Sequence, residues 1–185
     1  MRRVLAVLGP SGCGKTETRM RLLGRDSRFR IIPAFTTRSL REDETDRVKI
    51  TAQEFNTLLS GGDLIAVREL YGAHYGTSLN LVRKAIADGN LPLLDWPIAS
   101  FEELIQHFAD DLFTLYLRPP SISELAERLS RDGRDPTGAR LEAAIHEAEY
   151  VEASGLLGRM DQVLLSLENE QDAIAEAVYR HFASL

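Results

Sequence analysis

The 185 residues are 44% hydrophobic and 27% charged, which is typical of one soluble domain long enough to bury a sizeable core. The chain carries 22 Lys and Arg against 28 Asp and Glu, and the resulting net charge of −6 argues against a general nucleic-acid binder. Its single cysteine, Cys13, excludes an intramolecular disulfide and a multi-cysteine metal site, and no apolar run reaches the roughly 18–20 residues of a membrane span. We expect a soluble, cytoplasmic protein with neither a membrane nor a nucleic acid as partner.

Predicted strands and helices alternate from the N-terminus onward. Strands are predicted at 4–8, 64–70, 91–96, 113–117 and 162–167, with a short apolar stretch at 31–35. Helices are predicted at about 15–23, 52–60, 78–87, 100–108, 121–131, 139–155 and 170–182. Ser121 or Ser123, together with Glu124, is the predicted cap of the fifth helix. Residues 71–76 are predicted to form a turn, and residues 132–138 a polar loop.

The order of these elements predicts the fold class. Short apolar strands separated by helices, beginning with strand, glycine loop and helix, favour an α/β fold with a parallel sheet and helices on both faces. The polar stretch from about 36 to 75 breaks this alternation, so we expect it to form a small lobe beside the core. No internal repeat or long linker indicates a second domain.

The loop after the first predicted strand carries the strongest functional signal. Residues 9–16 match the phosphate-binding pattern G-x-x-x-x-G-K-[ST] in full, and a strand precedes them and a helix follows. Its glycines let backbone N–H groups turn toward phosphates, and the helix N-terminus adds partial positive charge. Lys15 can reach the β- and γ-phosphates of ATP, and the Thr16 hydroxyl can bind Mg²⁺. The predicted ATP site comprises Gly9, Pro10, Ser11, Gly12, Cys13, Gly14, Lys15 and Thr16. We interpret Cys13 as a small residue at a permissive position; a redox-sensitive thiol is the alternative.

Further polar residues could bind the molecule that receives the phosphate. Arg38 and Arg41 are three residues apart, so that both guanidinium groups could bind one phosphate monoester. Tyr75 and Thr77 offer a phenol and a hydroxyl near the start of a predicted helix. Four arginines surround the predicted polar loop and could close over the phosphates as a lid: Arg128, Arg131, Arg134 and Arg140. For each group alone, a solvated surface with ion pairs is the alternative.

Together these motifs resemble the guanylate kinase family over nearly the whole chain. The resemblance rests on G-P-S-G-x-G-K-T (9–16), T-T-R-x-x-R-x-x-E (36–44), G-x-x-Y-G-T-S (72–78), L-L-D (93–95), P-P-S-x-x-E-L-x-x-R-L (119–129) and G-R-D-x-x-x-x-R-L (133–141). It implies a single domain with the three-layer α/β fold of P-loop NTPases, in which the parallel sheet core carries an inserted acceptor-binding lobe and a helical lid. The core would span 1–33, 76–120 and 156–185, the lobe 34–75 and the lid 121–155.

The resemblance also implies an activity, the transfer of the ATP γ-phosphoryl group to a nucleoside monophosphate in the presence of Mg²⁺. By position, it assigns Lys15 and Thr16 to ATP and the metal. It makes Lys15, Arg131 and Arg140 the catalytic residues and places Arg134 beside ATP. The acceptor would be bound by Arg38, Arg41, Tyr75 and Thr77. Asp95, the first acidic residue of the family's L-L-D-x-D segment, would lie with them and order the water molecules of the metal.

The chain departs from the family where guanine is recognised. A serine and a glutamate that normally bind guanine are replaced by Ala34 and Ala66. A tyrosine that normally helps to bind the acceptor phosphate falls on Ile50, and the second acidic residue of L-L-D-x-D is Pro97. Alanine cannot accept hydrogen bonds from guanine N1–H and N2–H₂, so we expect altered or relaxed base recognition.

Three functional interpretations follow. The first is a nucleoside monophosphate kinase with altered base recognition. The second is a kinase of a phosphorylated sugar, similar to the ribose 1,5-bisphosphate phosphokinases, which also lack the guanine-binding residues. The third, a non-catalytic binding module, is disfavoured by the intact phosphate-binding residues. Strand alternation predicts Leu64, Ala66 and Arg68 on the pocket face, where Arg68 would suit an extra phosphate or carboxylate of the acceptor, and Glu69 on the opposite face.

Overall fold

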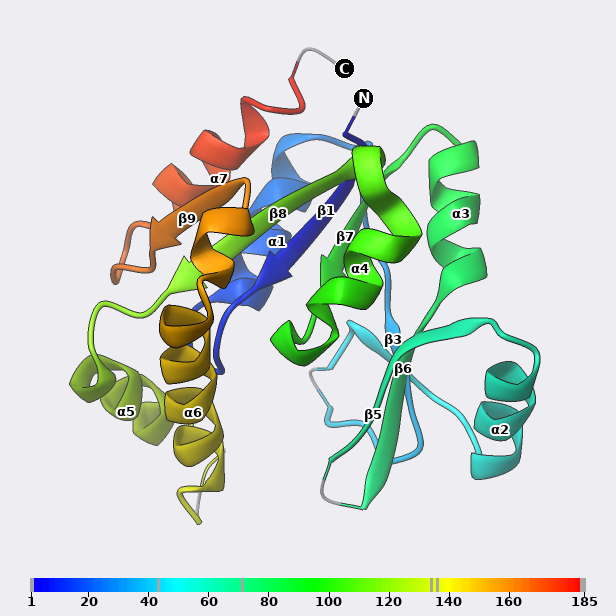
Figure 1. Cartoon of the computed structure of the whole chain (residues 1–185), viewed down its shortest axis with the longest axis horizontal. Coiled ribbons are helices and arrows are strands. Elements are labelled where there is room, and N and C mark those ends of the chain that lie inside the picture. The colour runs from blue at the N-terminus through cyan, green and yellow to red at the C-terminus, as the bar shows by residue number, and fades with distance from the viewer. Residues whose placement is uncertain (1, 43, 71, 134, 136, 184–185) are drawn as a thin grey trace.

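Two β-sheets with flanking helices make up the computed structural model, which describes residues 2–42, 44–70, 72–133, 135 and 137–183 (Figure 1). The larger sheet has the strand order β2 (Phe29–Ile31), β7 (Leu91–Asp95), β1 (Val4–Leu8), β8 (Leu112–Arg118) and β9 (Gln162–Leu165), and all neighbouring strands are parallel. The smaller sheet has the order β4 (Arg47–Lys49), β3 (Ala34–Thr36), β6 (Ala73–Ser78) and β5 (Leu64–Leu70). The α-helices of the described residues are α1 (Lys15–Arg25), α2 (Ala52–Ser60), α3 (Leu79–Ala87), α4 (Phe101–Phe108), α5 (Ile122–Arg131), α6 (Ala139–Ser154) and α7 (Gln171–Tyr179). The predicted α/β class with a parallel sheet core is confirmed.

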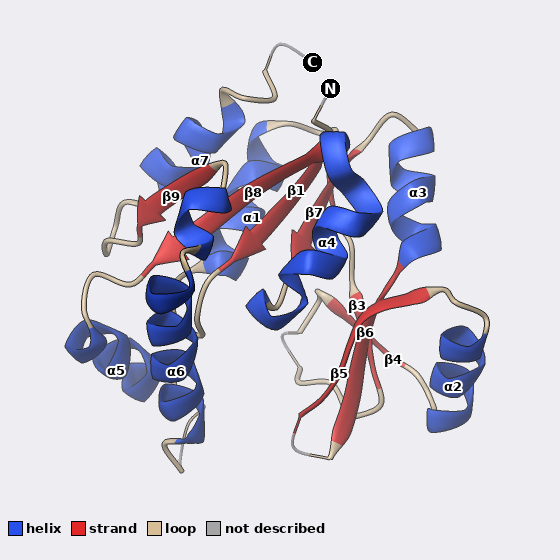
Figure 2. Ribbon diagram, viewed as in Figure 1, coloured by secondary structure: helices blue, strands red, loops and turns tan. Residues whose placement is uncertain are grey.

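Strand β1 shows why the larger sheet is covered on both faces. All five of its residues are buried, and successive side chains of a strand point to opposite faces. Val4, Ala6 and Leu8 belong to one hydrophobic cluster, and Leu5 and Val7 belong to another. Helices α3 and α4 cover the first cluster and α1 and α7 cover the second, which makes three layers (Figure 2).

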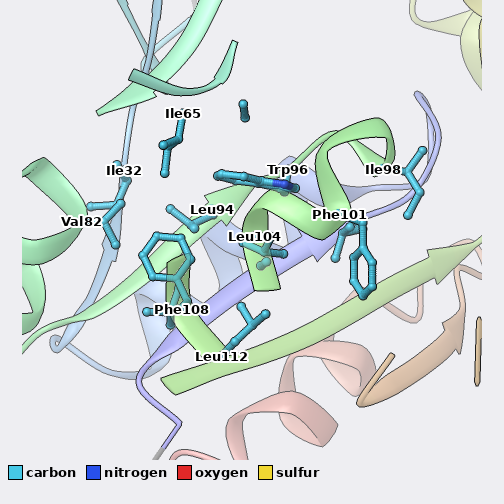
Figure 3. Packing of buried hydrophobic residues seen from close by; sticks show 14 of the residues in the cluster. Ile32, Ile65, Val82, Leu94, Trp96, Ile98, Phe101, Leu104, Phe108 and Leu112 are labelled. Carbon is cyan, nitrogen blue, oxygen red and sulfur yellow. The ribbon is translucent and has the colours of Figure 1, made fainter. Parts of the chain in front are cut away.

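The smaller sheet corrects one prediction and adds a strand. Residues 73–76, predicted to lie in a turn, form part of β6 instead. This strand pairs antiparallel with β3 along one edge and with β5 along the other, and the two sets of hydrogen bonds outweigh the turn tendency of Gly72 and Gly76. The short polar strand β4, parallel to β3, was not predicted. Ile65 of β5 packs into the first hydrophobic cluster together with Trp96, which attaches the smaller sheet to the core (Figure 3).

A β-bulge in β5 changes which side chains share a face. Ile65 pairs with Thr77, but the next regular pair is Arg68 with Tyr75, so one extra residue lies between them on β5. Ala66, in this bulge, has a positive φ of 52°. Regular strand alternation predicts Arg68 on the face of Leu64. Because of the bulge, Arg68 lies instead on the face of Ile65 and Tyr75. The inserted residue changes the alternation at this point.

The lid region and the smaller sheet lie on opposite sides of the carboxyl end of β1 (Figure 1). Helix α5 begins as predicted, because the hydroxyl of Ser121 accepts a hydrogen bond from the backbone N–H of Glu124 at 3.1 Å. Across the described part of the chain, no helix is long and apolar enough to cross a membrane. The fold thus places the helical lid region and the smaller sheet on either side of the glycine loop after β1.

Candidate active site

The glycine loop between β1 and α1 is closely packed. Gly9 and Gly12 have positive φ angles of 133° and 87°, which L-amino acids rarely adopt. A Cβ on Gly9 would lie 2.5 Å from the carbonyl oxygen of Leu117, and a Cβ on Gly12 would lie 3.0 Å from Leu125. The loop therefore passes closely over the end of β8 and the side of α5. This path presents backbone N–H groups and the N-terminus of α1 to a bound anion.

Lys15 and Cys13 occupy different environments within this loop. The Lys15 ammonium donates hydrogen bonds to the carbonyl oxygens of Gly9 and, at 3.1 Å, Pro10, which holds its charge above the loop. Cys13 is fully buried, and burial raises the pKa of its thiol to about 11 against the opposing charges of Lys15 and Arg128. A buried, protonated thiol is a poor nucleophile, which supports the interpretation of Cys13 as a packing residue.

On the side of the smaller sheet, Arg38 is already bound within the protein. Its guanidinium forms an ion pair with Glu44 and donates a hydrogen bond to the hydroxyl of Tyr75 at 3.0 Å. Burial would raise the pKa of Glu44, but hydrogen bonds from Arg38 and from the backbone of Arg41, with the charge of Arg47, lower it to about 2. Glu44 is therefore a carboxylate at neutral pH and orients Arg38 beside Tyr75.

A cleft of about 610 Å³ joins the loop, the smaller sheet and the lid region. The predicted site residues that line it are Ser11, Gly12, Cys13, Gly14, Lys15, Thr16, Arg41, Asp95, Arg128, Arg131 and Arg140. Arg38 is half-buried, Tyr75 and Thr77 are buried in β6, and these three are not among the residues that line the cleft. Arg134 lies outside the described residues. The structure thus brings most of the predicted residues to one cavity.

The lid arginines are held by ion pairs at the edge of the cleft. Arg131 contacts Glu168 at 2.5 Å, and Arg140 contacts Asp132 at 3.4 Å. Arg128 is anchored more firmly, since it donates to the hydroxyl and carbonyl oxygens of Ser166 at 3.2 and 2.7 Å. With 62% of its side chain exposed, Arg131 can exchange its carboxylate partner for a ligand in the cleft.

Arg19 and Arg47 are among the charged residues at the site that the sequence analysis did not predict. Arg19 is 1% exposed and donates to Asp46 at 2.8 Å and to the hydroxyl of Thr16 at 3.4 Å. The spacing of three residues between Thr16 and Arg19, which places both on one helix face, was the available signal. Arg47 lies 3.7 Å from Asp95 and hydrogen-bonds Glu44 at 2.9 Å. No signal pointed to Arg47, because its position depends on the unpredicted strand β4.

The oxygen ligands that line the cleft fit Mg²⁺. Burial would raise the pKa of Asp95, but the charges of Lys15, Arg19, Arg47 and Arg68 outweigh it and hold this pKa below its usual value. A carboxylate and the hydroxyl of Thr16 thus line the same cavity. Mg²⁺ prefers oxygen ligands and usually binds through one or two protein groups together with substrate phosphates. This donor set suits such a metal.

Comparisons with known proteins agree with this geometry. A family model described as guanylate kinase matches residues 1–174. A guanylate kinase of Chlorobium luteolum is 32% identical over 182 residues, covering 95% of this chain and 90% of that protein. A guanylate kinase of Bacillus anthracis is 33% identical over 175 residues, covering 90% and 85%. Among solved structures, a guanylate kinase from Anaplasma phagocytophilum has a TM-score of 0.70 at 21% identity, covering 98% of this chain and 83% of that one. A shikimate kinase from Acinetobacter baumannii has a TM-score of 0.53 at 12% identity, covering 100% and 94%. The two structural likenesses concern the fold.

Proposed function

The chain belongs to the guanylate kinase family, and from this premise we propose that it phosphorylates an acceptor other than GMP. The chain is an ATP-dependent nucleoside monophosphate kinase, the class of its curated relatives. What the family leaves open is the acceptor that this particular site prefers. The residues at the positions that would recognise a base bear on this preference.

We assign the phosphoryl transfer to the residues around the glycine loop. The backbone N–H groups of the loop bind the β- and γ-phosphates of ATP, and the Lys15 ammonium moves from its carbonyl partners onto them. The acceptor phosphate binds to Arg38 and Arg41, and Glu44 keeps Arg38 oriented. The Thr16 hydroxyl would hold Mg²⁺ together with the phosphates, and Asp95 would order its water molecules; the metal would supply charge neutralisation.

The lid arginines complete this assignment. Arg131 and Arg140 line the cleft from the helical side, facing the loop that would hold the γ-phosphate. Charge spreads over the transferred group in the transition state, and guanidinium groups placed there lower its energy. Each gives up a single carboxylate partner, Glu168 or Asp132, to reach it.

We expect the two pairs of arginines to affect different kinetic parameters. Arg38→Ala or Arg41→Ala should raise the KM for the acceptor by about 10- to 100-fold, because both contact a phosphate present before and during transfer. Arg131→Ala or Arg140→Ala should instead lower kcat by about 10²- to 10³-fold. Steady-state kinetics with both substrates measure this, with the exposed Arg83→Ala as the control. Equal increases in the KM for ATP across all four variants would contradict the division.

The preference against guanine rests on one observation, the buried apolar character of Ala66. This residue is 0% exposed, belongs to the first hydrophobic cluster and donates its backbone N–H to Glu103 at 2.9 Å. Neither it nor Ala34 has a side chain that accepts a hydrogen bond. The carboxylate of Asp63 accepts hydrogen bonds from the hydroxyl of Ser78 and the backbone N–H of Asn80, which hold it at the start of α3.

We predict that GMP is a poor substrate. Two guanine donors left without partners cost about 1–3 kcal/mol each, or roughly 10- to 100-fold in kcat/KM per group. The measurement is kcat/KM for GMP, AMP, CMP and UMP by ADP release, with Lys15→Ala protein prepared in parallel to subtract contaminating kinases. A value for GMP of about 10⁵ M⁻¹s⁻¹ or more, above the other three, would withdraw the proposal.

A further inference from the structure

We propose that Arg68 recognises a second anionic group of the acceptor, a phosphate or carboxylate distinct from the phosphate that receives the γ-phosphoryl group. The inference rests on the proposed function, since it assumes that the acceptor binds against β5 and β6. It concerns the chemical class of the acceptor. The absence of guanine-binding groups shows what this site lacks but does not define that class.

The first observation is the position that the bulge gives to Arg68. One inserted residue in β5 brings Arg68 opposite Tyr75, the residue that also contacts Arg38. The guanidinium carbon of Arg68 lies 5.6 Å from the centre of the Tyr75 ring, that of Arg47 also lies at 5.6 Å, and that of Arg38 at 5.9 Å. Three guanidinium groups therefore surround one phenol ring.

The second observation is that these three cations differ in their partners. Arg38 and Arg47 both hydrogen-bond to Glu44. Arg68, in contrast, has one long hydrogen bond to the carbonyl oxygen of Ala66 at 3.4 Å. No carboxylate of the described residues lies within 4.0 Å of its guanidinium nitrogens. The five N–H donors of Arg68 are thus largely unused, and the same Tyr75 ring is contacted by Arg47, which lines the cleft.

The electrostatic environment makes this arrangement costly in the absence of a ligand. Burial lowers the pKa of Arg68, and this effect outweighs the negative charge of Asp95, which raises the pKa, while the positive charge of Arg47 lowers it further. A partly buried guanidinium remains charged, so it needs an anion or several acceptors to offset its lost hydration. The acceptor molecule is the group that can supply them.

The chemistry of guanidinium then specifies the class of group. It only donates hydrogen bonds, in a planar fork that matches a carboxylate or two oxygens of a phosphate. The N1–H and N2–H₂ donors of guanine, which a carboxylate accepts, find no acceptor in a guanidinium. Position 66, where the family has a carboxylate, is an alanine, and two residues farther along β5 the cation Arg68 lies on the same face as Tyr75. At this site the protein would therefore donate hydrogen bonds to the acceptor molecule, whereas the family's carboxylate accepts them.

The test compares acceptors that differ by one anionic group. The probes are AMP and CMP, each with a single phosphate, against adenosine 3′,5′-bisphosphate, ribose 1,5-bisphosphate and orotidine 5′-monophosphate, which carries a carboxylate on its base. We expect wild-type kcat/KM for at least one doubly anionic probe to exceed that of AMP and CMP by about 10- to 100-fold. Which probe this is distinguishes a phosphate from a carboxylate.

The variants assign that preference to Arg68. Arg68→Met removes the charge but keeps a long side chain. This variant should lose the preference of about 10- to 100-fold for the doubly anionic probe, and its kcat/KM for AMP and CMP should change by less than about 3-fold. Arg68→Lys should retain part of it, and the exposed Arg83→Met should leave it intact. Isothermal titration of the same probes to the wild-type protein gives a readout that does not require any variant to fold.

Three results would overturn the inference. One is a wild-type enzyme with no preference for any doubly anionic probe. The second is an equal loss on all acceptors in Arg68→Met, which would place Arg68 on the phosphate already held by Arg38 and Arg41. The third is a preference that survives Arg68→Met. Failure here with GMP still a poor substrate leaves the proposed function standing, whereas efficient GMP phosphorylation overturns that function whatever Arg68 does.

Discussion

Replacement of Lys15 with alanine should lower kcat by about 10³-fold while leaving the fold intact. The hydrogen bonds of the Lys15 side chain in the described structure go to the carbonyl oxygens of Gly9 and Pro10, and water can replace them. Its charge, by contrast, faces the phosphates at the moment of transfer, when their negative charge is redistributed. The loss should therefore appear in catalysis and not in stability.

The measurement is kcat with the best acceptor of the panel, together with the thermal midpoint of unfolding. Lys84→Ala is the matched control, because Lys84 is exposed on α3 and pairs only with Asp88. Retention of more than about a tenth of the wild-type kcat by Lys15→Ala would show that Lys15 is not the catalytic lysine.

The second large effect concerns stability and comes from the ion pair of Arg19 and Asp46. Arg19 is 1% exposed, whereas 16% of the Asp46 side chain is exposed at the cleft. Asp46→Ala leaves a buried guanidinium without its carboxylate, so the free energy of unfolding should fall by about 3–5 kcal/mol. Arg19→Met should cost less, since Asp46 can be hydrated from the cleft and a methionine fills the buried space.

Denaturation by urea measures both variants and their combination. Adding Arg19→Met to Asp46→Ala should recover most of the lost stability, because the unpaired buried charge is removed. The ion pair Arg159–Glu102, exposed on both sides, is the control, and Glu102→Ala should change the free energy of unfolding by less than about 1 kcal/mol. Losses that simply add in the double variant would contradict this account.

The features that could be predicted from the sequence are those encoded in a few neighbouring residues. The glycine loop, the strand before it and the helix after it follow from one contiguous motif, and the helix at 52–60 has the predicted bounds. Strands β4 and β6 could not be recognised in this way. β4 has only three residues, and they are mostly polar. β6 is stabilised by pairing with β3, which is distant in the sequence, and with β5, its antiparallel partner in a hairpin.

The residues of the candidate site show the same distinction between local motifs and contacts that depend on the fold. Lys15, Thr16 and Arg41 belong to local motifs and line the cleft. Arg19 and Arg47 acquire their roles only through Asp46, Glu44 and Asp95, partners that the fold brings together. The orientation of Arg68 depends on a single inserted residue in β5, which a regular alternation of side chains cannot anticipate.

The conformation of Ala66 has an evolutionary consequence. A glutamate introduced there would have to adopt a φ of 52° and place a carboxylate in the first hydrophobic cluster, where Glu103 already occupies the backbone N–H. We therefore expect that Ala66→Glu alone does not create guanine recognition, because the extra residue of the bulge must be deleted as well. We expect the substitution and the deletion to be epistatic, so that neither alone raises the activity on GMP and a stepwise route to guanine recognition is blocked.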